Sequence, residues 1–235
     1  MAEIKRDEYS INFLRLKFNR ISFELEIYMK KIVLIIGLFN LQNSFAATKI
    51  AMFVNEGFKG EEYFIPRKAF DDAGYEVKVV TRYSGMVNPT RHDQPKFHGV
   101  SSDLTFETVK PEGFDALVFV GGSGAWTDFF PNLSIHKILK GAFERNQWLA
   151  LICASTGVLA TADNLGGDGT PLAKGRHVTG YPEVSGLLKK LGQVSYDLGD
   201  PNLPKVVVDG HLITGRDPMS AHLFGETIVS NLSKK

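Results

Sequence analysis

The chain has a single cysteine, Cys153, among its 235 residues. An internal disulfide is therefore excluded, and so is any zinc site that needs a Cys-x-x-Cys pair. The six histidines show no His-x-x-x-His spacing, and no segment has the spaced glycines of a dinucleotide fingerprint. The sequence thus predicts neither a metal site nor a cofactor.

Neither sign of charge is in excess, because 27 lysine and arginine residues face 26 aspartate and glutamate residues, for a formal net charge of +1. There is no basic stripe with interleaved aromatic side chains, so nucleic acid is not an expected partner. The 43% of hydrophobic residues suits a chain with one globular core. Because no internal repeat or linker follows residue 46, residues 47–235 are predicted to form a single domain.

The N-terminal region lacks an apolar run long enough to span a bilayer, which takes about 20 residues. Its run at 32–39 is shorter, follows two lysines, and precedes the small residues Ser44 and Ala46. This order is typical of a secretory signal peptide over residues 29–46, cleaved after Ala46. We expect a periplasmic or secreted bacterial protein with no stable membrane insertion after cleavage, or a cytoplasmic one if the run is a buried strand.

Residues 1–28 are unusual in front of such a signal, because they carry five basic and five acidic side chains. Signal peptides normally begin the chain, with the basic region at the start. We therefore interpret Met29 as the true start and residues 1–28 as an extension foreign to the native protein.

The rest of the sequence alternates short apolar runs with amphipathic segments. Strands are predicted at 50–54, 75–81, 116–120, 148–152, 206–208 and 212–214. Helices are predicted at 61–73, 133–145, 156–162 and 219–232, and a hairpin or long loop at 84–103. Apolar strands separated by helices indicate an α/β fold with a mostly parallel sheet covered on both faces. The Asp-Gly pair at 209–210 adds one antiparallel hairpin.

Cys153 directly follows one predicted strand and stands just before a predicted helix. A turn this sharp, eased by the small residues Ala154 and Ser155, presents the thiol at the carboxyl edge of the sheet, where ligands of such folds collect. The dipole of the following helix is expected to lower the pKa of the thiol. The competing interpretation is a small buried side chain without any chemistry.

Two further pieces end at the same edge of the sheet. In the glycine-rich turn 121–124, the N–H groups of Gly121 and Gly122, together with that of Ala154, are candidates to bind a developing oxyanion, although the turn also suits a plain connection. Glu62 lies in the first turn of a predicted helix. It either hydrogen-bonds the sulfur and tunes its ionisation, or is a solvated partner of the helix dipole.

Several short segments occur in a specific order along residues 48–233. They are Gly57-Phe58 with Glu61-Glu62 and Ile65-Pro66, Val120-Gly121-Gly122, Ile152-Cys153-Ala154, Thr179-Gly180-Tyr181-Pro182, and Val207 to Pro218. Together they resemble the DJ-1/PfpI superfamily. The resemblance implies a three-layer, flavodoxin-like sandwich, usually dimeric, with the cysteine on a nucleophile elbow. It also implies that Glu62 lies beside the thiol, that Gly122 and Ala154 supply backbone amides, and that Gly121, Ser123, Tyr181 and Arg216 line the site.

Two positions depart from that family pattern. Protease-like members have a histidine directly after the cysteine, where this chain has Ala154. Members closer to the human protein have a histidine before a proline, where this chain has Tyr181. Without either base, peptide hydrolysis lacks a general acid for the leaving amine. A thiol tuned by Glu62 can still form a sulfenic acid or attack a reactive carbonyl. His177 lies in a strand-like run and is expected to be structural.

We therefore expect a homodimeric envelope protein whose Cys153 reacts with oxidants or small carbonyl electrophiles. Its role would be a stress response of the glyoxalase, deglycase or chaperone type. Two alternatives stay open: a cysteine peptidase or amidase that acts on peptides with a histidine from elsewhere, and a non-catalytic binding or sensing module. An α/β-hydrolase with Ser155 as nucleophile is disfavoured, because the glycine two residues earlier is missing. A class I glutamine amidotransferase is excluded by the lack of a downstream His-x-Glu.

Cleavage of the signal peptide gives the first prediction. When the native gene is expressed in a bacterial host, N-terminal sequencing of the exported protein should begin at Ala47, because small residues precede this bond. A mature N-terminus before Met29 would contradict both the signal peptide and the proposed start.

Overall fold

The computed structural model describes residues 25–26, 28–32, 47–162 and 169–234. The chain divides into two compact units, residues 1–46 and 47–235, each described by itself. The described residues of the first unit are helical, with an ion pair of 2.7 Å between Lys30 and Glu26. The predicted extension and signal peptide otherwise lie outside the described residues. Within the described part of the chain, no helix is long and apolar enough to cross a membrane.

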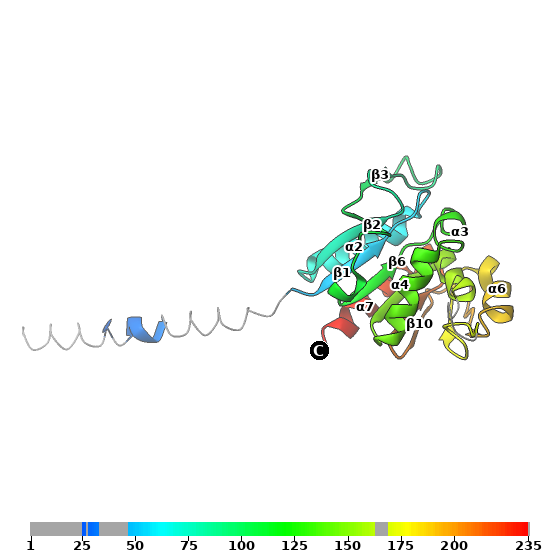
Figure 1. Ribbon diagram of the computed structural model, residues 1–235. Coiled ribbons are helices and arrows are strands. Elements are labelled where there is room, and N and C mark those ends of the chain that lie inside the picture. Colours follow the sequence, from blue (N-terminus) through cyan, green and yellow to red (C-terminus); the bar gives the residue numbers. More distant parts are fainter. Residues whose placement is uncertain (1–24, 27, 33–46, 163–168, 235) are drawn as a thin grey trace, which may run out of the picture. The chain divides into compact units, whose positions relative to one another are not determined.

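A seven-stranded sheet forms the centre of the second unit, in the order β10-β11-β7-β6-β1-β2-β5 (Figure 1). Its strands are β1 (Lys49–Phe53), β2 (Glu76–Thr81), β5 (Leu104–Thr105), β6 (Ala116–Phe119), β7 (Trp148–Ile152), β10 (Val206–Asp209) and β11 (Leu212–Gly215). All neighbours pair in parallel except β10 with β11. The fold is therefore the mostly parallel α/β sandwich with one antiparallel hairpin that the sequence predicts.

Helices connect and cover these strands. They are α2 (Gly60–Asp72), α3 (Ala125–Asp128), α4 (Leu133–Glu144), α5 (Val158–Thr161), α6 (Ser185–Lys190) and α7 (Ala221–Leu232), with 3-10 turns η1 (Pro111–Gly113), η2 (Cys153–Gly157), η3 (Pro182–Val184) and η4 (Pro218–Ser220). Two small sheets lie outside the main one: antiparallel β3 (Met86–Val87) with β4 (Val100–Ser101), and parallel β8 (His177–Val178) with β9 (Ser195–Tyr196).

The direction of the crossovers places helices on both faces of the sheet. From β1 the chain passes through α2 to β2 on one side, whereas from β6 it passes through α4 to β7 on the other side. Right-handed crossovers in opposite directions put their helices on opposite faces. Helix α7 packs against α2, where a Cβ added to Gly225 would lie 3.0 Å from the Cα of Pro66.

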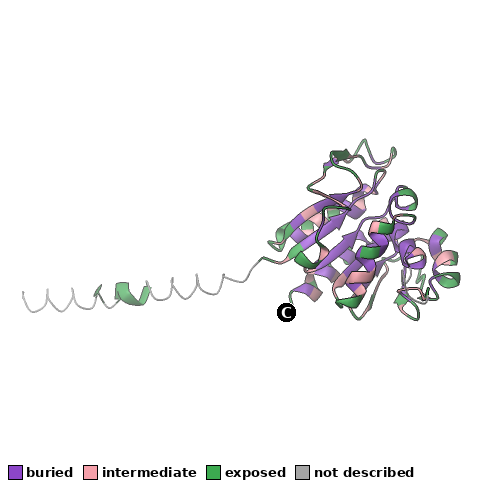
Figure 2. Cartoon of the chain, viewed as in Figure 1, coloured by how far each residue is buried: buried purple, intermediate pink, exposed green. Residues whose placement is uncertain are grey.

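The apolar character of the central strands follows from this double cover. The β1 residues from Ile50 to Phe53 have no exposed surface, nor has any residue of β6, and Figure 2 shows the middle of the sheet buried throughout. The rings of Phe53 and Phe119 stack across the β1–β6 pair at a centroid distance of 4.3 Å. Residues buried on both faces give continuous apolar runs instead of alternation.

The structure confirms the predicted strands and the helices before and after β6 to within about two residues at each end. It differs directly after Cys153, where the predicted helix 156–162 is replaced by the turn η2 and the four-residue helix α5. The predicted helix 219–232 begins at Ala221, after η4. The short elements β5, β8, β9 and α6 have no periodicity that the sequence could reveal.

The order of the strands determines where a site can form. The chain leaves β1 toward β2 and later returns to β6 on the other flank of β1, so the direction reverses between β1 and β6. Ligands of open parallel sheets bind outside the carboxyl ends of the strands at such a point. The segments that follow β1, β6 and β7 carry Glu62, Gly121 with Gly122, and Cys153 respectively.

Candidate functional site

Cys153 occupies a strained turn between β7 and η2. Its φ is +60°, in the left-handed region, whereas the preceding Ile152 is extended. A side chain other than glycine, asparagine or aspartate rarely adopts this conformation, which costs of the order of 1–3 kcal/mol. The residue is 5% exposed and contributes to the wall of a surface cleft. The predicted elbow is thus present, and its strain points to a function for this position.

The side chain of Ser155 holds the elbow against the sheet. Its hydroxyl oxygen lies 2.9 Å from the carbonyl oxygen of Phe119 and 2.7 Å from that of Ile152, and it accepts the N–H of Ile152 at 3.1 Å. Ser155 has no exposed surface. The structure therefore gives Ser155 an anchoring role and no access to a substrate, which removes the α/β-hydrolase alternative.

Further contacts fix the far side of the turn. The carbonyl oxygen of Cys153 accepts the hydroxyl of Thr156 at 2.7 Å and the backbone N–H of Tyr181 at 3.2 Å. Tyr181 consequently lies next to the thiol, and its half-buried side chain lines the same cleft. Gly180 allows this approach, because a Cβ there would overlap the side chain of Thr156.

Glu62 reaches the elbow from the first turn of α2 and has no exposed surface. Neither of its carboxyl oxygens makes a hydrogen bond of regular geometry, and the polar groups that act on it are the Cys153 thiol, the ammonium of Lys59 and the N–H of Gly121. Gly121 allows the Glu62 carboxyl and the Cys153 side chain to lie this close together. A Cβ there would overlap the Glu62 carboxyl and lie 2.7 Å from the Cβ of Cys153.

The electrostatics of the Glu62–Cys153 pair differ from the prediction from sequence, which was a lowered pKa for the thiol. Burial raises the pKa of Glu62 to about 8, and the neighbouring thiol and Lys59 oppose the rise only in part. Burial, followed by the charge of Glu62, raises the pKa of Cys153 well above its usual value, although the N–H of Ala154 lowers it. The expected helix dipole is weak here, because a 3-10 turn and a four-residue helix follow the cysteine.

At neutral pH Glu62 is therefore mostly a neutral carboxylic acid. A neutral carboxyl removes the negative charge that opposes thiolate formation, and its O–H can donate to the sulfur. Thiolate formation at Cys153 is therefore less disfavoured while Glu62 keeps its proton, and the titrations of the two groups are coupled.

Gly122 and Ala154 place two backbone amides at the cleft that holds Cys153. Gly122 adopts a φ of +116°, and a Cβ there would overlap the carbonyl oxygen of Gly57 and lie 2.8 Å from the nitrogen of Lys59. Its N–H makes no hydrogen bond within the described residues. The turn is held from below by Asn55, whose Nδ2 donates to the carbonyl oxygens of Val120 and Gly121 at 2.9 and 3.2 Å. With the N–H of Ala154 on the sulfur, these groups can stabilise developing negative charge.

The cleft above the thiol has a volume of about 970 Å³. Of the predicted site residues, Cys153, Ala154, Gly122, Ser123 and Tyr181 line it, whereas Glu62 and Gly121 lie beneath its floor. Within the described residues, no group of three histidine, cysteine, aspartate or glutamate side chains could hold a metal ion.

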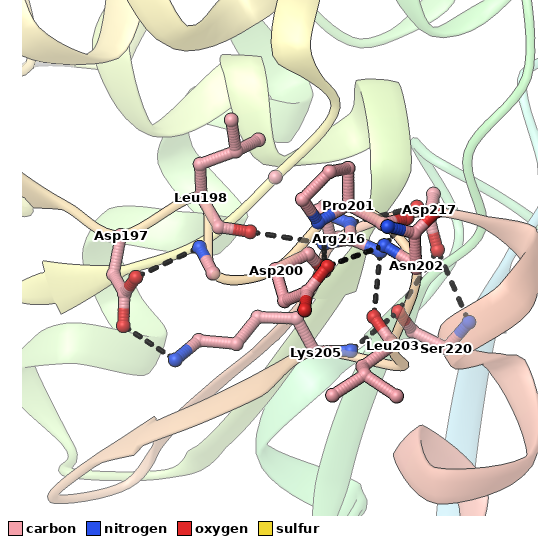
Figure 3. Close-up of polar contacts among 12 residues, drawn as sticks. Asp197, Leu198, Asp200, Pro201, Asn202, Leu203, Lys205, Arg216, Asp217 and Ser220 are labelled. Atoms are coloured by element: carbon pink, nitrogen blue, oxygen red, sulfur yellow. Dashed lines mark hydrogen bonds and ion pairs between the residues drawn. The ribbon is translucent and has the colours of Figure 1, made fainter.

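Arg216 does not line the cleft, contrary to the prediction. It is 1% exposed, and its guanidinium donates to four backbone carbonyls of one loop, those of Leu198 (3.1 Å), Asp200 (2.6 Å), Pro201 (3.3 Å) and Leu203 (2.7 Å) (Figure 3). Its Nε donates to Asp217 at 2.7 Å, and Asp217 caps η4 through Ser220. Pro218, next along the chain, is a cleft residue. The guanidinium of Arg216 therefore holds the loop and the cap of η4 in place, and it contributes to the cleft only indirectly.

Sequence reasoning missed the polar residues of the outer wall. Lys59, Arg91, His92, Trp126 and Glu183 all line the cleft. Their signals were present but weak, since Lys59 stands only three residues before Glu62 and the other wall residues come from turns or from helical segments of three or four residues. His177, expected to be structural, lies in β8, where its backbone N–H donates to Asp209 at 2.7 Å.

Loss of the Ser155 hydroxyl tests the anchoring of the elbow. Ser155→Ala should lower the free energy of unfolding by about 1–3 kcal/mol, because the buried N–H of Ile152 loses its acceptor and the carbonyl that receives the single hydroxyl proton loses its donor. Urea unfolding of this variant and of the control Ser230→Ala, at an exposed site on α7, would measure the effect. Equal stabilities would show that the elbow does not depend on this hydroxyl.

The raised pKa of Glu62 predicts a pH-dependent stability. Between 4.5 and about 8 the folded state keeps a proton that the unfolded state releases, so stability falls as pH rises, by at most about 1.4 kcal/mol per pH unit. Glu62→Gln has no such loss, and its Tm relative to the native protein should increase across this window. The exposed substitution Glu107→Gln is the control. Parallel Tm profiles for native protein and Glu62→Gln would contradict the assignment.

Comparison with known proteins places this geometry in a family. The family model of the DJ-1/PfpI family matches residues 48–231. An uncharacterized protein of Methanocaldococcus jannaschii, MJ0967, is 29% identical over 83% of this chain and 85% of its own. Deglycase PH1704 of Pyrococcus horikoshii is 26% identical over 78% and 99%. The crystal structure of Drosophila melanogaster DJ-1beta superposes with a TM-score of 0.68 and 25% identity, covering 81% of this chain and 92% of that one. This chain belongs to the DJ-1/PfpI family.

Proposed function

We propose that Cys153 is the nucleophile of a protein that reacts with oxidants or with small carbonyl electrophiles. The observation that carries the proposal is a thiol on a strained elbow, open to a cleft and backed by a buried, mostly neutral carboxyl. A structural cysteine needs neither the strain nor the uncompensated burial of Glu62. The Pyrococcus relative named as a deglycase is consistent with carbonyl chemistry.

The residues of the site suit addition of the sulfur to an aldehyde or ketone. A bond forms between Sγ of Cys153 and the carbonyl carbon while the carbon–oxygen π bond opens onto oxygen. Gly122 lines the cleft and its N–H has no hydrogen-bond partner within the described residues, which makes this N–H a candidate donor to the developing oxyanion. The oxygen takes up one proton and the thiol loses one, so the product is a neutral hemithioacetal. With a peroxide, the same sulfur displaces water or an alcohol and becomes a sulfenic acid.

Export and dimer formation are also part of the proposal. The signal-like segment at 29–46 supports a periplasmic or secreted location, where a lone cysteine has no internal partner for a disulfide. A stress-response role would then consist in intercepting electrophiles or oxidants in the envelope. The homodimer that the family resemblance implies is proposed with them.

A cysteine peptidase or amidase is the second candidate, because His92 lines the same cleft as Cys153. A histidine there is the type of group that hydrolysis of an amide needs to protonate the leaving amine. A relative in Bacillus subtilis, 29% identical over 75% of this chain and 93% of its own, is named as a candidate cysteine protease, YraA. Peptide turnover that disappears in both Cys153→Ala and His92→Asn would favour this candidate.

Intact-mass measurement tests the reactive thiol. After mild peroxide the native protein should gain one or two oxygen atoms, and after methylglyoxal the mass of one such molecule. Cys153→Ala should lack the additions to the thiol, because Cys153 is the only cysteine of the chain, whereas oxygen on methionine and methylglyoxal on arginine or lysine would appear equally in both proteins.

Glu62→Gln serves as the matched variant in this experiment. It keeps a neutral hydrogen-bonding group beside the sulfur and should still react, whereas Glu62→Ala should react more slowly. Equal modification of native protein and Cys153→Ala would contradict the proposal. Unmodified native protein would favour the non-catalytic binding or sensing module.

A further inference from the structure

Lys59 is a fixed cation in the wall of the thiol cleft. Its Nζ lies 2.9 Å from Oδ1 of Asp93, whose side chain is only 6% exposed. The other oxygen of Asp93 accepts the N–H of Gly60 at 3.0 Å, which holds the carboxylate in place. Burial lowers the pKa of Lys59, but Asp93 and the nearby carboxylates outweigh this effect and raise the pKa above its usual value. The side chain keeps 31% exposure, and two of the three ammonium hydrogens remain for a ligand.

The ammonium belongs to the reacting end of the cleft. The backbone N–H of Lys59 donates to the carbonyl oxygen of Gly121 at 3.2 Å, so the residue is tied to the turn beneath the thiol. Its charge acts on both Glu62 and Tyr181, the two side chains next to Cys153.

Further polar side chains, of which Arg91 is a cation, extend this wall outward. Arg91 and His92 are exposed, line the cleft, and come from the loop that also carries Asp93. Arg91 forms no ion pair within the described part of the chain. Of the acidic lining residues, Glu56 is engaged by the N–H of Asn88 at 3.0 Å. Glu183 follows Tyr181 in the chain, in a different segment from the cationic residues.

We propose that this cleft selects electrophiles that carry a carboxylate beside the reactive carbon, as 2-oxo acids do. The carboxylate binds Lys59, and the adjacent carbon then meets the sulfur of Cys153. This inference rests on the proposed reactivity of the thiol and adds the charge of its substrate. For a 2-oxo acid, a sulfur–carbon bond forms, the carbonyl π bond opens onto oxygen, and that oxygen takes up a proton equivalent to the one lost by the thiol. The product is an anionic hemithioacetal.

Iodoacetate and iodoacetamide provide a matched pair of probes. Both alkylate sulfur with loss of iodide, and they differ mainly in charge. Any change in the thiolate population affects both rates equally, so the ratio of the two rate constants reports recognition of the carboxylate alone. In the native protein this ratio should exceed that of N-acetylcysteine and should fall in high salt.

The variants separate charge from structure. Lys59→Met should lower the ratio about tenfold, in the range expected for one charge-assisted hydrogen bond. Lys59→Arg should largely preserve it. The charge of Arg91, on the outer part of the wall, should matter less than that of Lys59. Arg91→Gln is therefore expected to lower the ratio of the two rate constants only about twofold. Lys68→Met is the control, because Lys68 is an exposed residue of α2, the helix that begins directly after Lys59, and is paired with Asp72 at 2.7 Å.

Removal of Lys59 leaves Asp93 buried without its partner, so Lys59→Met combined with Asp93→Asn is measured as well. Thermal unfolding confirms that each variant is folded. Adducts of glyoxylate and of methylglyoxal, followed by intact mass, should show the same loss of preference for the anion. If the ratio of the two alkylation rate constants is unchanged both in Lys59→Met and in the double variant, the inferred recognition of the carboxylate is wrong. The proposed reactivity of the thiol is not affected by that result. If neither reagent alkylates the folded native protein, both proposals fail.

Discussion

The contact between the Glu62 carboxyl and the Cys153 thiol is the constraint on which the site depends. Each group alone would be costly at this depth, because burial disfavours both the carboxylate and the thiolate. Side by side they can share protons, and the pair can carry one charge where two would repel. Gly121 is the condition for this contact, since any side chain would fill the space that the two groups occupy. The position of β6 relative to β1 and β7 brings the three residues together.

Much of the fold could be predicted because the central strands are buried on both faces. Continuous apolar runs such as that of β6 leave a clear signal, and the Asp-Gly pair marks the hairpin. The short elements were missed because two residues, as in β8, carry no periodicity. The helix after Cys153 was predicted from its apolar residues, but the hydrogen bonds of Ser155 and Thr156 bend the chain into a 3-10 turn.

The candidate site was only partly accessible to sequence reasoning. Cys153 and Glu62 could be named because sharp turns and family motifs are local in sequence. The charge state of the pair depends on burial, which is a property of the folded chain, so the expected low thiol pKa was wrong. The role of Arg216 was misjudged for the same reason, because its direction depends on a loop that precedes it by more than ten residues.

The site is formed by loops as well as by the ends of the sheet strands. The loop with Asp93 fixes Lys59, and the loop from Asp197 to Lys205 folds around the guanidinium of Arg216. The buried charge of Arg216 is satisfied largely by backbone carbonyls, and that of Asp93 by the Lys59 ammonium and one backbone N–H, which gives definite positions to loops that have little regular structure. Relatives that share the sheet can therefore differ in chemistry through these loops.

The left-handed backbone of Cys153 has a consequence for how this position can change. Glycine adopts a φ of +60° without strain, so replacement of the cysteine by glycine would remove a cost that the fold now carries. Folding stability and chemistry thus make opposite demands on one residue. Among substitutions at this position, glycine is the one that the backbone conformation favours, so retention of a cysteine here is not explained by backbone stability.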